Sequence, residues 1–160
     1  MFLRDDDVGP HSVGSGPLPA IEAHARKPAM KSKLPLIARL LLGAVFLFGS
    51  LSFFLNLVPP PTDMPAPLKT FNEGLMASGY FFTLLKTTEL VCGLMLVSGF
   101  FVPLALVILA PISLNIFLVH SMLAPEGLPL AIVIGLLMIY LAFFAEPYAS
   151  SIRPLFRPRP

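Results

Sequence analysis

Two charged side chains interrupt a hydrophobic stretch of the sequence, and they are the first candidates for chemistry. Lys86 and Glu89 lie near the middle of residues 80–98, YFFTLLKTTELVCGLMLVS, a run long enough to cross a bilayer. Ten strongly apolar residues in this run favour insertion by about 0.5 kcal/mol each, whereas each charge opposes it by roughly 2.5 to 3.5 kcal/mol. Because the sum is near zero, the segment is expected to span a membrane only where neighbouring helices shelter both charges.

A third charge, Arg39, falls inside the first hydrophobic segment, residues 34–58. At a helical rise of about 1.5 Å per residue, Arg39 lies roughly 6 Å from the start of its segment, and Glu89 lies roughly 13 Å inside its own. An extended arginine could close much of that gap, so the spacing predicts an Arg39–Glu89 ion pair between two helices. Lys86 is one helical turn from Glu89 and is the competing partner.

Charges inside a membrane helix indicate a functional site by default, and the alternative is a polar clasp that holds the helices together. Because the sequence contains no cofactor motif, we favour the clasp for Arg39, Lys86 and Glu89. Later segments add three polar side chains that a ligand could contact: Asn115, His120 and Tyr140. A quinone headgroup would accept hydrogen bonds from the histidine or the asparagine. No bound cofactor is predicted, and a quinone stays open as the alternative.

The composition excludes several kinds of site. Of the 160 residues, 56% are hydrophobic and only 12% are charged, with a mean hydropathy of +0.82, which is typical of a membrane protein. A single cysteine, Cys92, excludes an internal disulfide and a CxxC pair. One histidine in the membrane region cannot form a bis-histidine haem site. The chain shows no nucleotide-binding loop, no nucleophile elbow and no zinc-protease helix, so neither catalytic residues nor a metal site are predicted.

Four hydrophobic segments predict an all-α integral membrane four-helix bundle within residues 34–146. The expected helices cover about 34–58, 80–98, 100–123 and 129–145. The first could instead be a signal peptide, but its length and the lack of a cleavage site favour a retained helix. Residues 68–77 fit either a short interfacial helix or an ordinary polar loop. Pro111 interrupts the third helix, where Ser113 or Asn115 could bond the freed carbonyl.

The two ends of the chain differ from the bundle in composition. Residues 1–33 lack apolar periodicity and are expected to form a disordered tail, with Met30 as an alternative start of translation. Residues 147–160 form a basic, proline-rich tail that we expect to be unfolded. Lysine and arginine gather before the first helix and after the fourth, whereas the loops between hold one lysine. This pattern predicts that both termini are cytoplasmic, and it reports topology rather than binding of nucleic acid.

Three stretches together resemble the DoxX family of small bacterial four-helix membrane proteins. They are ARLLLGAVFLFGSLSFF, ELVCGLMLVSGFFVPLALVILAPI and NIFLVH. The family carries an arginine followed by E-x-x-x-G-x-x-L-x-x-G-x-x-x-x-x-A, and the matching residues here are Arg39, Glu89, Gly93, Leu96, Gly99 and Ala105. The resemblance covers about residues 34–145. It departs at residues 100–102, FFV, where the family often has a basic or polar residue, which puts a cytoplasmic contact at that turn in doubt.

The resemblance implies a multi-pass protein of the bacterial inner membrane whose partners are the lipid bilayer and a membrane or redox protein. Its leading implication is an accessory or structural subunit of a membrane redox or stress-related complex, without catalysis of its own. The alternative is a quinone-interacting subunit similar to that of thiosulfate:quinone oxidoreductase, using Glu89, Lys86 and His120 around a cavity. A solute carrier is disfavoured, because the four segments show no inverted repeat.

Overall fold

The computed structural model describes residues 33–59 and 63–157, and every regular element in these ranges is helical. The predicted N-terminal tail, including the alternative start at Met30, therefore lies outside the described residues except for Lys33. The α-helices are α1 Leu34–Phe54, α2 Ala66–Ala77, α3 Phe81–Ser98, α4 Val102–Met122, α5 Leu128–Ile139 and α6 Tyr148–Ile152. Shorter turns are the 3₁₀ helices η1 Pro125–Gly127 and η3 Arg153–Phe156 and the π-helical turn η2 Tyr140–Phe144.

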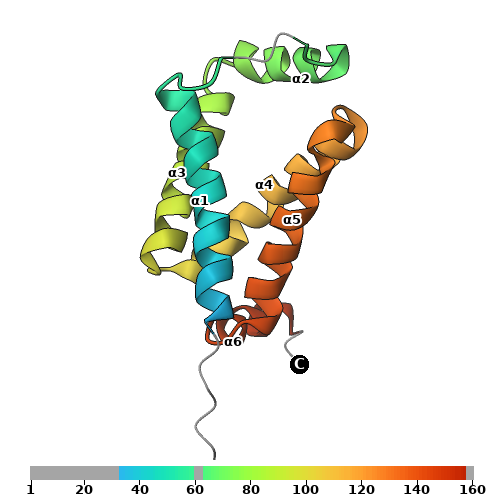
Figure 1. Cartoon of the computed structure of the whole chain (residues 1–160). Coiled ribbons are helices and arrows are strands. Elements are labelled where there is room, and N and C mark those ends of the chain that lie inside the picture. The colour runs from blue at the N-terminus through green and yellow to red at the C-terminus, as the bar shows by residue number, and fades with distance from the viewer. Residues whose placement is uncertain (1–32, 60–62, 158–160) are drawn as a thin grey trace, which may run out of the picture. The chain divides into compact units, whose positions relative to one another are not determined.

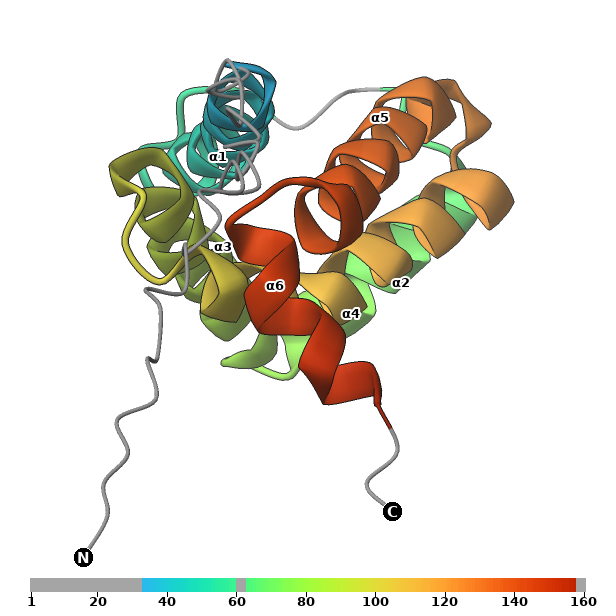
Figure 2. The ribbon, with the colours of Figure 1, turned by 90° about the horizontal axis from the view of Figure 1, so that it is seen from below.

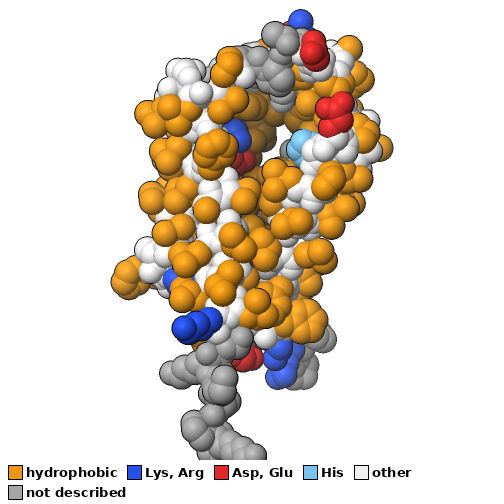
Figure 3. Space-filling view, in the orientation of Figure 1, with side chains coloured by type: hydrophobic (Ala, Val, Ile, Leu, Met, Phe, Trp, Pro, Cys, Tyr) orange, Lys and Arg blue, Asp and Glu red, His pale blue; other side chains and the backbone are white. Residues whose placement is uncertain are grey.

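Four helical segments in the described ranges are long and apolar enough to cross a membrane. They are Leu34–Phe54, Phe81–Ser98, Val102–Met122 and Pro125–Phe144. Large apolar side chains cover most of the face drawn in Figure 3, as expected for a surface in contact with lipid tails. The predicted all-helical fold with four spans is confirmed. The cytoplasmic placement of both termini stays a prediction.

The four spans form two pairs, with a short helix at each end. α1 packs along α3, and α4 packs along α5 (Figures 1 and 2). α2 lies across one end of the bundle, and α6 lies at the opposite end, where it packs against α4 (Figures 1 and 2). The centre is filled by apolar side chains from all four spans, among them Leu42, Leu96, Leu109 and Ile134.

Two glycines bring α1 and α3 into close contact. A Cβ atom added to Gly43 would lie 2.8 Å from Val97 Cγ2 and 3.2 Å from the Gly93 carbonyl oxygen. A Cβ on Gly93 would lie 3.2 Å from the backbone nitrogen of Leu47. In lipid, helices associate through such close packing, because water is not available to drive apolar surfaces together. The contact fixes how α3, with its two charges, is held against α1.

The first helix is shorter than the predicted segment 34–58, because α1 ends at Phe54. Asn56 adopts a left-handed backbone conformation with φ of +50°, and the Leu57 N–H donates to the Ser52 carbonyl. Asparagine tolerates this conformation better than most residues, so it suits a helix end. Hydropathy alone does not predict that the helix ends before the apolar segment does.

The expectation of an unfolded C-terminal tail is wrong for residues 148–156. They form α6 and η3, where Ala149 and Ile152 are buried and Tyr148 packs against the core. The Arg153 guanidinium donates to the Phe143 carbonyl and pairs with the Glu146 carboxylate at 3.5 Å. The apolar residues of YASSI lie on one helical face, and the prolines and arginines around them masked that pattern.

Replacing Gly43 or Gly93 by alanine should destabilise the protein, because the added methyl group has no room between α1 and α3. We expect a loss of about 1 to 3 kcal/mol, as for other overpacked contacts, measured as a lower melting temperature in detergent. Gly49→Ala on α1 is the matched control, since nothing lies within 4 Å of its added Cβ. Equal melting temperatures for all three variants would contradict the close contact.

Candidate functional site

Lys86 and Glu89 form an ion pair within α3. The Lys86 Nζ lies 2.8 Å from Glu89 Oε2, and the same lysine lies 5.9 Å from the centre of the Phe82 ring. The Glu89 side chain is only 5% exposed and that of Lys86 is 20% exposed. A charge at this depth is stable only when it is paired, so each residue of the pair stabilises the charge of the other.

The pair lies within one helix, and this changes the interpretation of the charged residues. A contact between residues three apart on α3 does not join α3 to another helix, so Lys86 and Glu89 do not act as an interhelical clasp. The predicted Arg39–Glu89 pair is not formed: among the described residues, Glu89 has Lys86 as its only salt-bridge partner. Lys86, which the sequence offered as the alternative partner of Glu89, forms the ion pair.

Arg39 lies at the C-terminal end of α3, far from Glu89. Its guanidinium occupies the space beside Gly99, and its Nη1 donates to the Tyr148 hydroxyl at 3.4 Å. Gly99 is ten residues beyond Glu89, or about 15 Å along the helix axis, which is too far for Arg39 to reach both. A cation at this position complements the negative C-terminal end of the α3 dipole. Gly99 has φ of +85°, so the turn and the arginine both depend on the absence of a side chain there.

The described residues line an open cavity of about 420 Å³ between the spans, and we call it the polar cavity. Its walls come from α1, α3, α4 and α5, and α2 supplies a fifth side. Most lining side chains are apolar, and the polar ones are Asn72, Lys86, Glu89, Asn115 and His120. Figure 3 shows a hollow between α1 and α5 with acidic, basic and histidine side chains visible inside it.

The structure thus brings together four of the six residues singled out in the sequence: Lys86, Glu89, Asn115 and His120 line the polar cavity. Arg39 and Tyr140 do not line it. Tyr140 begins the π-helical turn η2, where it packs against the apolar core. Within the described ranges, no group of three or more His, Cys, Asp or Glu side chains is placed to hold a metal ion.

The turn after α4 holds His120 in place. The ring Nδ1 lies 3.2 Å from the Ala124 carbonyl oxygen, and the ring covers Gly127 so closely that a Cβ atom there would overlap it. Gly127 closes the 3₁₀ turn η1, which links α4 to α5. The histidine is therefore fixed by two backbone features of the turn rather than by another side chain.

α2 contributes a residue that the sequence analysis missed. Its more buried side chains, Leu68, Phe71, Asn72 and Leu75, recur at helical spacing and line the polar cavity. Of the two alternatives for residues 68–77, an interfacial helix or a polar loop, the structure shows the helix, and it shows which face of that helix covers the cavity. Asn72 donates to the Met64 sulfur at 3.5 Å, so its amide oxygen keeps its capacity to accept.

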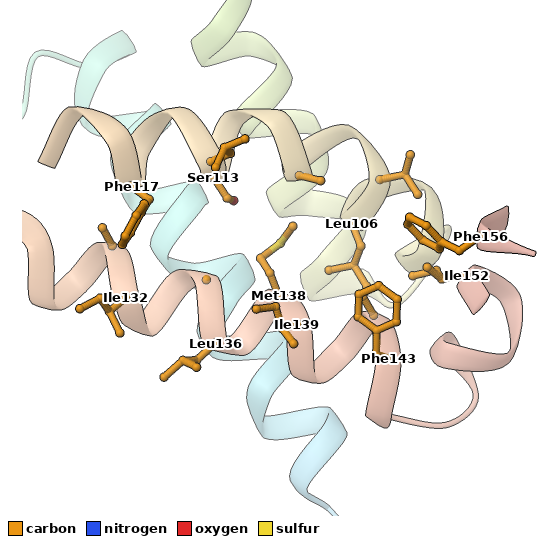
Figure 4. A pocket seen from close by; sticks show the side chains of 16 residues that line it. Leu106, Ser113, Phe117, Ile132, Leu136, Met138, Ile139, Phe143, Ile152 and Phe156 are labelled. Atoms are coloured by element: carbon orange, nitrogen blue, oxygen red, sulfur yellow. The ribbon is translucent and has the colours of Figure 1, made fainter. Parts of the chain in front are cut away.

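A second hollow of about 550 Å³ lies between α4 and α5, bordered by η2, α6 and η3 (Figure 4). We call it the apolar groove, because among its lining side chains only Ser113 is polar. The Ser113 hydroxyl is buried without a hydrogen-bond partner among the described residues, and it does not bond the carbonyl freed by Pro111. Asn115, the other candidate for that bond, lines the polar cavity instead.

These features define a helical multi-pass membrane protein with a buried ion pair beside a polar cavity. A family model described as DoxX matches residues 34–121, more than half of the chain. The chain therefore belongs to the DoxX family, as the resemblance predicted. The search of curated proteins and the search of solved structures each gave no match.

The ion pair makes a prediction about stability. Lys86→Met should lower the free energy of unfolding by up to about 3 kcal/mol, because it leaves a buried carboxylate unpaired. The double substitution Lys86→Met with Glu89→Leu removes both charges, and its stability should return to within about 1 kcal/mol of the parent protein. Both values follow from unfolding in mixed detergent.

Arg39→Met combined with Glu89→Leu serves as the comparison, because those two residues are not partners. This pair of substitutions should leave Lys86 unpaired and should not recover stability. Recovery by the Arg39 combination but not by the Lys86 combination would contradict the observed pairing.

Proposed function

We propose that this DoxX family protein binds a quinone-class ligand in the polar cavity. The single observation that carries the proposal is the convergence of Lys86, Glu89, Asn115 and His120 on one largely apolar cavity between the spans. Ligand sites are typically concave and apolar, with a few converging polar groups that fix the orientation of the ligand. The polar cavity has this character.

The donor set suits the proposed headgroup. A quinone carries carbonyl oxygens on a flat apolar ring, so it needs hydrogen-bond donors within an apolar enclosure. Lys86 and Asn115 supply N–H donors, while Phe46, Phe71 and Phe82 line the same cavity. At about 420 Å³ the cavity is in the size range of small-molecule sites. A quinone held here would supply two-electron redox chemistry, and the chain would bind and orient it.

The charged pair supports a ligand site over a purely structural role. Burying charges costs several kcal/mol, and a clasp between helices would offset that cost by holding the bundle together. The Lys86–Glu89 pair lies within one helix and faces the polar cavity. Because the pair does not join two helices, helix packing does not offset the cost of burying it. An interaction with a ligand would offset that cost.

The proposed role is that of a ligand-holding subunit rather than an enzyme. The polar groups of the cavity are one amine, two amides, a carboxylate and an imidazole, which do not carry electrons themselves. Electron transfer to or from a bound quinone therefore needs a redox group on a partner protein. This proposed role is the accessory subunit that the family resemblance implies, in a complex of the bacterial inner membrane.

Binding of a short-tailed benzoquinone to the protein in lipid nanodiscs tests the proposal. The double variant Lys86→Met with Glu89→Leu removes the charged wall of the polar cavity and should weaken binding about 10-fold or more, as expected for loss of a charged hydrogen bond. Equilibrium dialysis with radiolabelled quinone gives the dissociation constants.

Ser113→Ala is the matched control, because it removes the polar group of the apolar groove and leaves the polar cavity intact. Its affinity should equal that of the parent protein. The proposal fails if the parent protein binds neither the quinone nor its hydroquinone, or if Ser113→Ala weakens binding while the double variant does not.

A further inference from the structure

The hydrogen bond of His120 determines which ring nitrogen is left for a ligand. A backbone carbonyl can only accept a hydrogen bond, so the Nδ1 that contacts the Ala124 oxygen at 3.2 Å must carry the hydrogen. In the neutral ring, Nε2 then has no hydrogen and is an acceptor. Since His120 lines the polar cavity and its Nδ1 is bonded to the turn, Nε2 is the ring nitrogen left to accept from a bound molecule.

Glu89 presents a second acceptor from another helix. One of its carboxylate oxygens, Oε2, receives the hydrogen bond from Lys86. The other, Oε1, takes part in none of the hydrogen bonds of the described residues, and it is not one of their fully buried unpaired atoms, so it is accessible. An ionised carboxylate accepts and does not donate, so Oε1 also needs a donor from whatever fills the cavity. α3 and α4 thus each contribute to the same cavity a group that can only accept. The amides of Asn72 and Asn115, which also line it, carry both donors and an acceptor and can serve either kind of ligand.

From these two acceptors we infer that the polar cavity prefers a dihydroxy ring, the hydroquinone form, over the oxidised quinone. This inference rests on the proposed quinone site and adds selectivity to it. A hydroquinone donates from its two hydroxyl groups, so it can satisfy the His120 Nε2 and the Glu89 Oε1. A quinone has only carbonyl oxygens to offer. It would displace water from both acceptors without donating to either, and this loss of hydrogen bonds is unfavourable.

The donors of the cavity do not produce this preference. Lys86 and Asn115 can donate to a carbonyl oxygen or to a hydroxyl oxygen, so they serve both redox forms. Discrimination depends on the acceptors, and sites built around buried polar groups reject analogues that leave those groups unpaired. Gly127 is a positioning residue for this selectivity, because a side chain there would displace the His120 ring.

Parallel titrations with a short-tailed hydroquinone and its quinone, in nanodiscs and without oxygen, test the inference. The parent protein should bind the hydroquinone at least about 10-fold more tightly. For a two-electron couple, this ratio raises the midpoint potential of the bound ligand by about 30 mV relative to the free ligand. His120→Phe keeps a ring against Gly127 and removes the acceptor, so the ratio should fall several-fold.

Gly127→Ala is a second variant that acts on the position of the ring, and it should also lower the ratio. Gly135→Ala on α5 is its control, because nothing lies within 4 Å of the added Cβ, and it should retain the ratio of the parent protein. Equal affinities for the two forms, or an unchanged ratio in His120→Phe, would overturn the inference and leave the quinone site standing. Absence of binding for both forms would overturn the proposed function as well.

Discussion

The buried ion pair between Lys86 and Glu89 is the constraint on which the rest of the structure depends. Residues 80–98 are only marginally stable as a membrane span, because their two charges offset the apolar contribution of the segment. Pairing at 2.8 Å within α3 reduces that cost locally. The other spans and α2 then enclose the pair and leave it facing a cavity rather than lipid.

The polar groups of the bundle are divided between its two ends. Toward α2, the ion pair, Asn115 and His120 surround the polar cavity. Toward α6, Arg39 contacts the α3–α4 turn and Tyr148, where it stabilises the join between the spans and the C-terminal helix. Close packing of α1 against α3 separates these two regions with an apolar layer that includes Leu42 and Leu96. Binding and structural support therefore involve different charged residues.

Hydropathy was enough to predict the four spans, since each is a long apolar run, and the spacing of Lys86 and Glu89 was enough to make them candidate partners. The prediction of an Arg39–Glu89 pair was wrong. It compared how deep each residue lies along its own helix, and this does not tell which way each helix turns its side chains. The short apolar pattern around Ala149 was hidden among prolines and arginines. The cavity itself depends on which faces of five helices meet, and the turn that holds His120 depends on backbone geometry that residue types alone do not reveal.

The most direct measurement is the position of a brominated benzoquinone, located by anomalous scattering in crystals of the protein grown from a lipid phase. The account predicts a bromine peak inside the polar cavity, between Glu89 of α3 and His120 of α4 and beneath α2. A peak confined to the apolar groove between α4 and α5, or an empty polar cavity at saturating ligand, would contradict it.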